Sequence, residues 1–166
     1  FSSLTYCLSA IEPARTTAAI GDQITYRITV PAVEQSTDLN DVRILDDLNT
    51  SGADISLVGV TKISSGGSWI PGNTSGDPKN LVIEDTLGGG IDIPAGLFAI
   101  IDITVVLNDS ASNTKGTVFI NTADYTYNAA RDPGQPANSG PITIIEPDSV
   151  VLAKDGPLTM GVGTPA

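Results

Sequence analysis

Apolar and polar residues alternate strictly along residues 23–30, QITYRITV. The apolar residues share one face of this segment and the polar residues share the other, which is the period of a half-buried β-strand. No stretch of useful length carries the 3.6-residue period of an amphipathic helix. Further strand candidates, separated by Gly, Pro, Asn and Ser, are 41–48, 55–63, 81–85, 97–107, 116–127 and 141–147. The pattern predicts an all-β, immunoglobulin-like sandwich of about seven to nine strands.

The length of the chain, 166 residues, is enough for one domain with a sizeable apolar core. We predict a β-sandwich domain over residues 1–147 and a C-terminal extension over residues 148–166. The extension contains SVVLAK (149–154), which has the composition of a strand. The run DPGQPANSGP (132–141) and the Glu146-Pro147 pair are expected to be semi-rigid spacers, so that the extension leads away from its own domain.

The composition argues against several classes of function. A net charge of −11 without a basic stripe argues against a nucleic-acid partner. The longest apolar run, 97–107, is interrupted by Asp102 and is too short to span a bilayer. The chain has no histidine, which removes the commonest general base and the commonest zinc ligand. We therefore expect a protein that is not an enzyme, needs no cofactor and has no membrane span.

The first residue of the chain is Phe1 rather than methionine. This start indicates a mature end from which a signal peptide has already been removed. The acidic composition also suits a surface that is exposed to salt and divalent cations. We expect an extracellular or cell-surface protein.

An acidic segment, DLNDVRILDDLN (38–49), is a candidate calcium site. Calcium takes about six to eight oxygen ligands, and Asp38, Asp41 and Asp47 would contribute carboxylates. The segment lacks the Asp-x-Asp-x-Asp-Gly spacing of a calcium-binding loop. The alternative is solvated charge at a sheet edge, where it discourages aggregation between edges.

Three smaller features leave alternatives open. Glycosylation sequons begin at Asn49, Asn73 and Asn108, and they matter only if the source organism attaches N-glycans. Cys7, the one cysteine, cannot form an internal disulfide and is expected to be a buried, inert residue. Trp69 lies in a Gly/Pro-rich loop, either as an anchor that folds the loop back or as a binding aromatic of the kind found in sugar-binding modules.

Three predicted strands each carry one polar group on an apolar face. Asp46, Asn121 and Lys154 occupy these positions. Burying an acid, a carboxamide or an amine without a partner is costly, so one reading is that they meet one another or water. The other reading is that each one reaches solvent near the end of its strand.

Four segments, taken in order, resemble a known family. They are GDQITYRITV (21–30), DLNDVRILDDLN (38–49), IPAGLFAIIDITVVLN (93–108) and GTVFINTADYTY (116–127). Together they are similar to the repeat unit catalogued as domain of unknown function eleven, which occurs in bacterial and archaeal surface proteins. The resemblance covers roughly residues 20 to 127.

The resemblance implies positions for three residues. Repeats of this family begin with a short strand that carries a lysine, pass through an Asp-x-Leu-Pro turn and close on an Asn-rich strand. Asp46 falls at the start of that turn, where Asn49 replaces the expected proline, and Asn121 falls on the closing strand. No lysine precedes Gly21 in this chain, and the lysine with matching surroundings is Lys154. The extension therefore resembles the first strand of a following repeat.

Two classes of function follow from this arrangement. In the first, the protein is a structural subunit of a homopolymeric surface filament, and Val150, Val151 and Leu152 of one copy add a strand to the next. In the second, it is a spacer or a sugar- or calcium-binding module of a larger surface protein. The family's pairing of lysine with asparagine further implies an isopeptide bond between subunits.

The bond would join Lys154 to Asn121 of the next copy, with Asp46 or Glu84 as the assisting acid. Desolvation would lower the pKa of the lysine, so that a neutral amine becomes available, and would raise the pKa of the carboxyl. Such a bond would make a filament durable without any cysteine.

Overall fold

The computed structural model describes residues 15–64, 67–128, 130–131 and 136–146. These residues form thirteen strands and one short 3-10 helix, and they contain no α-helix. Cys7 and the extension over 148–166, including Lys154, lie outside the described residues. The elements are β1 (Thr17–Ala18), β2 (Gln23–Val30), β3 (Leu39–Asp47), η1 (Leu48–Thr50), β4 (Ile55–Lys62), β5 (Pro71–Asn73), β6 (Asn80–Asp85), β7 (Ile91–Ile93), β8 (Ala99–Leu107), β9 (Val118–Phe119), β10 (Thr122–Tyr127), β11 (Ala130–Arg131), β12 (Ala137–Asn138) and β13 (Ile142–Ile144).

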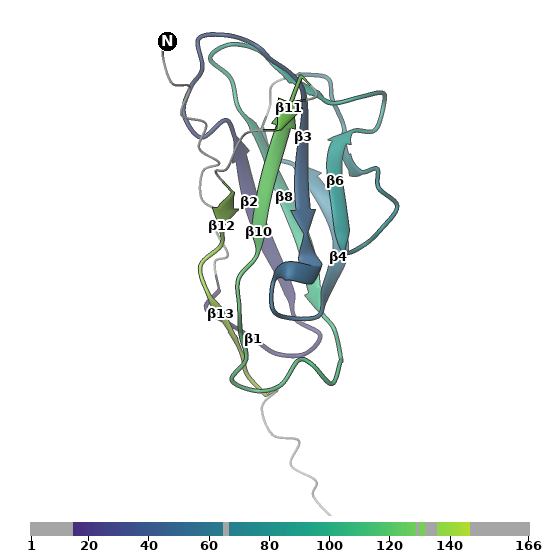
Figure 1. Cartoon of the computed structure of the whole chain (residues 1–166), viewed down its shortest axis with the longest axis vertical. Coiled ribbons are helices and arrows are strands. Elements are labelled where there is room, and N and C mark those ends of the chain that lie inside the picture. The colour runs from purple at the N-terminus through teal and green to yellow at the C-terminus, as the bar shows by residue number, and fades with distance from the viewer. Residues whose placement is uncertain (1–14, 65–66, 129, 132–135, 147–166) are drawn as a thin grey trace, which may run out of the picture.

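One layer of the molecule is a three-stranded antiparallel sheet in the order β2-β8-β4 (Figure 1). β2 and β8 pair over eight consecutive residues, with Tyr26 opposite Ile103. β4 pairs with the other side of β8, and its register shifts between Leu57 and Gly59, which is the mark of a β-bulge. β2 is therefore a regular strand at one edge of this group, and β4 is an irregular strand at the other.

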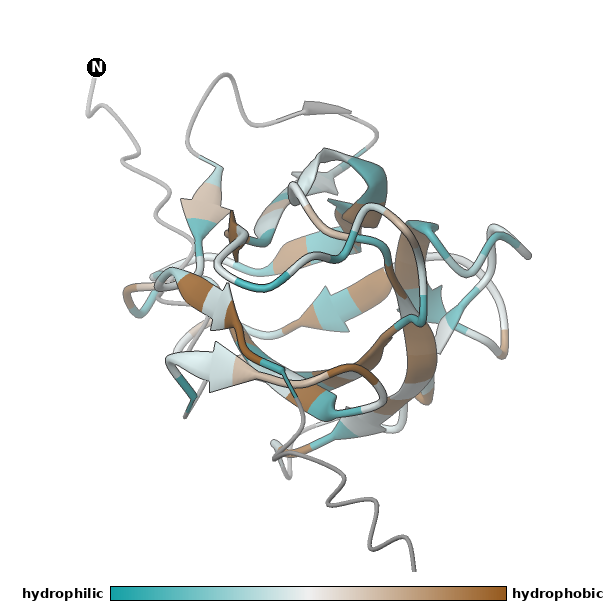
Figure 2. Ribbon diagram, turned by 90° about the horizontal axis from the view of Figure 1, so that it is seen from below, coloured by the Kyte–Doolittle hydropathy of each residue, from teal (hydrophilic) through white to brown (hydrophobic). Residues whose placement is uncertain are grey.

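The second layer is built around β3 and β10, with the strand order β11-β10-β3-β6-β5. β12 pairs with β10 and β7 pairs with β3, and a smaller sheet has the order β1-β13-β9. β9 and β10 are two parts of one strand path, interrupted at Ile120 and Asn121. Seen from below, the two layers face each other across an interior (Figure 2). The prediction of an all-β, immunoglobulin-like sandwich is confirmed, and the described residues divide it into thirteen strands instead of about seven to nine.

The core follows the alternation in the sequence. Every second residue of β2 is buried, so one face of this strand points into the interior. β8 alternates in the same way. Ten side chains on the inward faces of the strands are among those buried: Ile24, Tyr26, Ile28, Val42, Ile44, Ile101, Ile103, Val105, Phe119 and Tyr125. β-Branched residues dominate β8 because a branched side chain packs well on a pleated, half-buried surface.

The loop that contains Trp69 folds back onto the sandwich. Trp69 is only 7% exposed and packs with the core. The Lys62 ammonium lies 4.1 Å from the centroid of the Trp69 ring, and it donates to the carbonyl oxygen of Gly67 at 2.6 Å. A cation over an indole face is attracted by the ring quadrupole, which helps to hold the loop. Trp69 is thus a loop anchor, and its burial contradicts the alternative of a binding aromatic.

The run 132–141 is not only a spacer, as the sequence had led us to expect. Its second half contains β12, which pairs with β10, and it includes the buried residue Ser139. β13 then pairs with β9 and with β1. β12 could not be recognised in the sequence, because the residues that pair with β10 form a short segment between prolines. Residues 136–146 therefore belong to the sandwich.

No helix of the described residues is long and apolar enough to span a membrane. The longest apolar run, 97–107, contains β8, whose alternate residues are buried in the core.

We predict that Ile103→Ala destabilises the protein by about 2–5 kcal/mol, because it removes a fully buried side chain from the middle strand of the β2-β8-β4 sheet. Urea unfolding followed by circular dichroism measures the loss. Val58→Ala is the control, since Val58 is 50% exposed on β4 and its truncation should change stability by less than about 0.5 kcal/mol. Equal stability of the two variants would contradict the assigned core.

Candidate functional site

A carboxyl and a carboxamide meet inside the sandwich. Asp46 lies on the inward face of β3, which also carries Val42 and Ile44, and it is only 1% exposed. Asn121 lies at the interruption between β9 and β10 and is completely buried. The Nδ2 of Asn121 donates a hydrogen bond of 2.8 Å to Oδ2 of Asp46. The two predicted polar residues therefore contact each other, and neither reaches solvent.

The backbone around Asn121 is fixed by Ser139. The Asn121 N–H donates to Oγ of Ser139 at 2.9 Å, and the Ser139 N–H donates to the carbonyl oxygen of Asn121 at 2.8 Å. Next to this contact, Ala123 pairs with Asp46 across β10 and β3. The carboxamide is thus held between two neighbouring strand segments, which leaves its side chain little freedom to turn away from Asp46.

Three buried oxygen atoms have no hydrogen-bond partner within the described part of the chain. They are Oδ1 of Asp46, Oδ1 of Asn121 and the hydroxyl of Tyr26. Tyr26 projects from β2 in the opposite layer and interacts electrostatically with Asp46. Each buried polar atom without a partner costs about 1–3 kcal/mol, so three of them in one core point to a group that would satisfy them.

Burial changes the acidity of this cluster. Desolvation raises the pKa of Asp46 to about 7, the hydrogen bond from Asn121 opposes this shift, and the negative charge of Asp47 adds to it. Burial also raises the pKa of the Tyr26 hydroxyl, with a further contribution from the charge of Asp46. Near neutral pH, Asp46 can therefore both accept and release a proton, which an ordinary surface aspartate cannot do.

A chemical reaction at this carboxamide would need a nucleophile, and the amine of a lysine is one candidate. The chain has four lysines, and three of them are described. Lys62 lies over Trp69, and the other two form ion pairs at the surface, Lys79 with Asp54 and Lys115 with Glu146. None of these three lysines takes part in the Asp46–Asn121 contact.

Glu84, the other predicted assisting acid, is not brought to Asn121. It follows the buried Ile83 on β6, so the strand alternation places it on the outer side of the sheet. There its carboxylate accepts hydrogen bonds from Nε of Arg43 and from the hydroxyl of Thr74. The sequence did not show this because a six-residue strand can be read with either face inward. Asp46 is the acid at the site.

The three candidate calcium ligands each bind a different part of the backbone. Asp38 accepts a hydrogen bond from the Ala95 N–H, Asp41 accepts one from the Gly90 N–H, and Asp47 caps the N-terminus of η1. No group of three or more acidic or cysteine side chains that could hold a metal ion occurs among the residues that the structure describes. Calcium binding at this segment stays a prediction.

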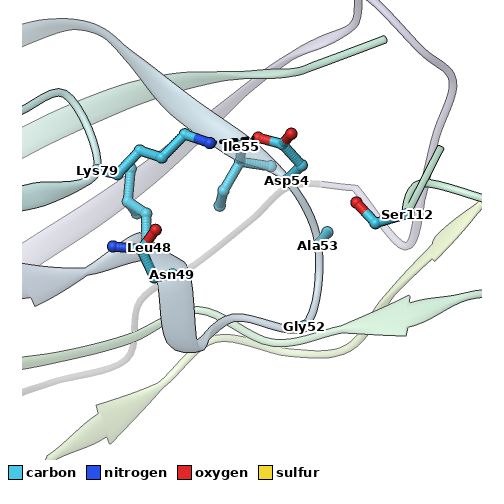
Figure 3. Close-up of a pocket in the computed structure, with 8 residues that line it drawn as sticks. All are labelled: Leu48, Asn49, Gly52, Ala53, Asp54, Ile55, Lys79 and Ser112. Carbon is cyan, nitrogen blue, oxygen red and sulfur yellow. Dashed lines mark hydrogen bonds and ion pairs between the residues drawn. The ribbon is translucent and has the colours of Figure 1, made fainter. Parts of the chain in front are cut away.

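A polar pocket lies at the lower end of the molecule, between η1 and the start of β4 (Figure 3). Its charged groups neutralise each other, because Lys79 lies 2.7 Å from Asp54, and Asn108 also donates to Asp54 at 2.7 Å. These bonds lower the pKa of the Asp54 carboxyl, with the Lys79 hydrogen bond as the main cause. The pocket thus offers no unpaired acid or base like Asp46.

The sequons differ in their surroundings. Asn49 lies at the rim of this pocket and is exposed. The side-chain nitrogens of Asn73 and Asn108 donate to the Asp77 carbonyl and to the Asp54 carboxylate, so a glycan at either site would break an internal hydrogen bond.

Sequence reasoning did not identify Tyr26 and Ser139 as parts of the site. Tyr26 was expected to be a core residue, and only its hydroxyl in a row of aliphatic neighbours hinted at a polar role. Ser139 lay in a proline-rich run and gave no signal.

The raised pKa of Asp46 predicts how stability depends on pH. Between the ordinary value of 3.8 and about 7, the folded state keeps a proton that the unfolded state releases. Raising the pH through this window therefore lowers the free energy of unfolding, by at most about 1.4 kcal/mol per pH unit, and the effect levels off above it. Asp41, Asp54 and Asp85, whose pKa values are lowered, lose their contribution only below the window.

We expect Asp46→Asn to remove this dependence, so that the variant gains stability relative to the wild type as the pH rises from 4 to 7. Urea unfolding at several pH values measures the difference. Asp109→Asn, which changes an exposed acid, is the control and should run parallel to the wild type. Parallel curves for Asp46→Asn as well would show that Asp46 is charged throughout the window.

No family model matches the chain, and no curated protein matches it by sequence. Solved structures are similar in fold. A cohesin module from a family 33 glycoside hydrolase of Clostridium perfringens has a TM-score of 0.55 and 11% identity, over 86% of this chain and 100% of that chain. Domains D2 and D3 of the major pilin SpaD from Corynebacterium diphtheriae have a TM-score of 0.50 and 20% identity, over 76% of this chain and 48% of that chain.

A family 123 glycoside hydrolase from Clostridium perfringens is less similar, with a TM-score of 0.42 and 16% identity over 78% of this chain. The chain spans 48% of the pilin structure and only 22% of this hydrolase. At these identities the similarities concern the fold alone. The chain thus shares its immunoglobulin-like β-sandwich with a bacterial cohesin module and with domains of a bacterial major pilin.

Proposed function

We propose that the protein is a structural subunit of an extracellular or cell-surface filament. Its C-terminal extension adds a strand to the next copy, and Lys154 of the extension forms an amide with Asn121 of that copy. The family resemblance to domain of unknown function eleven is part of this proposal. The protein is not an enzyme in this scheme, because each site forms one bond and is then consumed.

The observation that carries the proposal is the set of three buried oxygen atoms on Tyr26, Asp46 and Asn121. A lysine ammonium has three N–H donors and no acceptor, so it can satisfy three such atoms at once. The described lysines are engaged elsewhere, which leaves Lys154 as the lysine of this chain that could enter the site of another copy. A buried carboxylate is also far less costly when a cation pairs with it.

The chemistry then follows from the position of Asp46. When the extension places Lys154 in the site, the ammonium transfers a proton to the Asp46 carboxylate, which holds protons readily because of its raised pKa. The neutral amine attacks Cγ of Asn121, and the protonated acid polarises the carboxamide. Asp46 passes this proton to Nδ2 and takes up the proton that the attacking nitrogen loses, the Cγ–Nδ2 bond breaks, and ammonia leaves while Asp46 stays protonated. One amide is consumed and one is formed, so no oxidant or energy source is needed.

β2 is the strand to which the extension would add. The described strands leave it at the edge of the β2-β8-β4 group, it is regular over eight residues, and Tyr26 lies at its centre. β4 at the opposite edge carries a bulge, and bulges hinder strand addition.

The fold comparisons are consistent with a filament subunit but do not distinguish it from other functions of this fold. A pilin subunit and a cohesin module both have the sandwich. The second candidate is therefore a spacer or binding module, for sugar or calcium, in a larger surface protein. The observation that favours this second candidate is the coverage of the cohesin module, which is matched over 100% of its own length by 86% of this chain. A chain that stays monomeric at high concentration would support the module over the filament.

We expect Val150→Asp combined with Leu152→Asp to leave folded monomers. Burial of the three apolar residues at 150–152 would contribute about 1.5–3 kcal/mol each before entropy is subtracted, and two carboxylates in the acceptor sandwich would remove that gain. Electron microscopy and sedimentation velocity measure assembly, and circular dichroism checks folding. Normal filaments from this variant would show that the extension is not the donated strand.

We expect the filaments to give a ladder of covalent oligomers after boiling in detergent, with each link lighter by one ammonia in mass spectrometry. Lys154→Ala and Asn121→Ala should each abolish the ladder, while Asp46→Ala should slow or abolish it. Lys115→Ala is the matched control, because Lys115 is an exposed lysine of the same chain. Complete collapse of wild-type filaments to monomers would rule out the amide, and an unchanged ladder in Lys154→Ala would rule out Lys154.

A further inference from the structure

Exposed apolar side chains gather at the two opposite ends of the sandwich. The upper end is where β2, β4 and β6 finish and β8 begins, and the lower end is where β9 and β13 lie (Figure 1). Eight of the nine large apolar residues that are exposed lie at these ends. The upper patch consists of Val33, Ile63, Ile70, Leu87 and Leu97, and the lower patch consists of Val118, Ile120 and Ile145.

The loops of the upper patch are held by internal hydrogen bonds. Oδ1 of Asp85 accepts from the N–H groups of both Ile70 and Leu87 at 3.0 Å. The Ile63 N–H donates to the carbonyl oxygen of Ile100 at 2.8 Å. Leu87 is nevertheless 72% exposed. An apolar surface on loops that are already ordered loses little further entropy when a partner covers it.

The lower patch is the outer face of the β1-β13-β9 sheet. Val118 and Ile120 point outward on either side of the buried Phe119. Val118 pairs with Thr143, so Ile145, two residues later on β13's path, lies diagonally beside it. The Ile145 N–H donates to the carbonyl oxygen of Ala18, which holds this corner in place. The three side chains therefore form one small apolar surface on an ordered sheet.

We propose that copies of the chain stack head to tail, with the upper patch of one copy against the lower patch of the previous copy. This inference rests on the proposed function and gives the geometry of the filament. The stacking is inferred from the place where the chain leaves the domain. Glu146, the last described residue, lies at the lower end, so residues 147–166 begin beside the lower patch.

In such a stack, the extension of one copy meets the upper end of the next copy first. Running onward, it passes β2 from Val30 toward Gln23, which is antiparallel to β2, as are the other pairs of the β2-β8-β4 sheet. An extended strand rises about 3.3 Å per residue, so residues 147–154 would be long enough to reach along most of β2. The end contact and the strand addition are therefore compatible with a single arrangement of two copies.

The contact would join unlike surfaces. Such a heterologous contact leaves one free patch at each end of every oligomer, so it builds open chains. The net charge of −11 on each copy opposes the contact, and moderate salt should therefore strengthen it.

Three single substitutions test the contact. Leu87→Asp changes the upper patch, Val118→Asp changes the lower patch, and Val58→Asp is the matched control, a 50% exposed valine on β4 that belongs to neither patch. We expect filaments from Val58→Asp, as from the wild type. Either patch variant should need at least about tenfold more protein to assemble, as measured by sedimentation velocity, because a carboxylate would have to be desolvated in an apolar contact. Ile145→Asp replaces Val118→Asp if circular dichroism shows that the latter is unfolded.

Mixing the two patch variants gives the sharper result. The Leu87→Asp copy keeps an intact lower patch and the Val118→Asp copy keeps an intact upper patch. Equal amounts should therefore form one-to-one pairs and nothing longer. Filaments from both patch variants at the wild-type concentration would overturn the stacking, and so would a mixture without pairs.

These variants leave Lys154, Asn121 and Asp46 unchanged, so the two proposals fail separately. A detergent-resistant ladder from patch variants that assemble normally would retain the proposed function and reject the stack. Patch-dependent filaments that collapse to monomers in detergent would retain the stack and reject the amide.

Discussion

The hydrogen bond between Asn121 and Asp46 is the contact on which the rest of the site depends. It places an acid with a pKa of about 7 and a carboxamide side by side in an interior that is mainly aliphatic and aromatic. A core with apolar residues at both positions would be simpler to stabilise, because buried polar groups must find partners. The fold tolerates the pair because Ser139 and the β3–β10 pairing fix its backbone. Oδ1 of Asp46, Oδ1 of Asn121 and the hydroxyl of Tyr26 keep no hydrogen-bond partner among the described residues.

The sandwich could be predicted from the sequence because the pattern that specifies each strand lies within that strand. Alternation in β2 and β8 specifies both the strand and its inward face, and a buried strand cannot slip by one residue without exposing that face. The same alternation put Asp46 and Asn121 among core residues. Their contact could be anticipated only as one of two alternatives, since alternation gives the face of a residue and not its neighbour across the sheet.

The parts that could not be predicted depend on contacts between distant segments. Glu84 was a reasonable acid by type, but the short β6 strand presents it to Arg43 on the outer side. β12 could not be recognised among the prolines, because its pairing with β10 is not a property of its own residues. Tyr26 joined the site from the opposite layer, and residues from two layers are brought together only by the packing of one sheet on the other.

The regular ladder between β2 and β8 has a mechanical consequence. The strands run along the long axis of the molecule (Figure 1), and eight consecutive residue pairs join these two strands. A force applied between the two ends of the domain would pull neighbouring strands past each other. All the hydrogen bonds between β2 and β8 would then resist the force together and would have to break together. A force perpendicular to the strands would instead break these hydrogen bonds one after another. The orientation of this ladder makes the β2–β8 pairing most resistant to a force along the direction that joins the two ends of the domain.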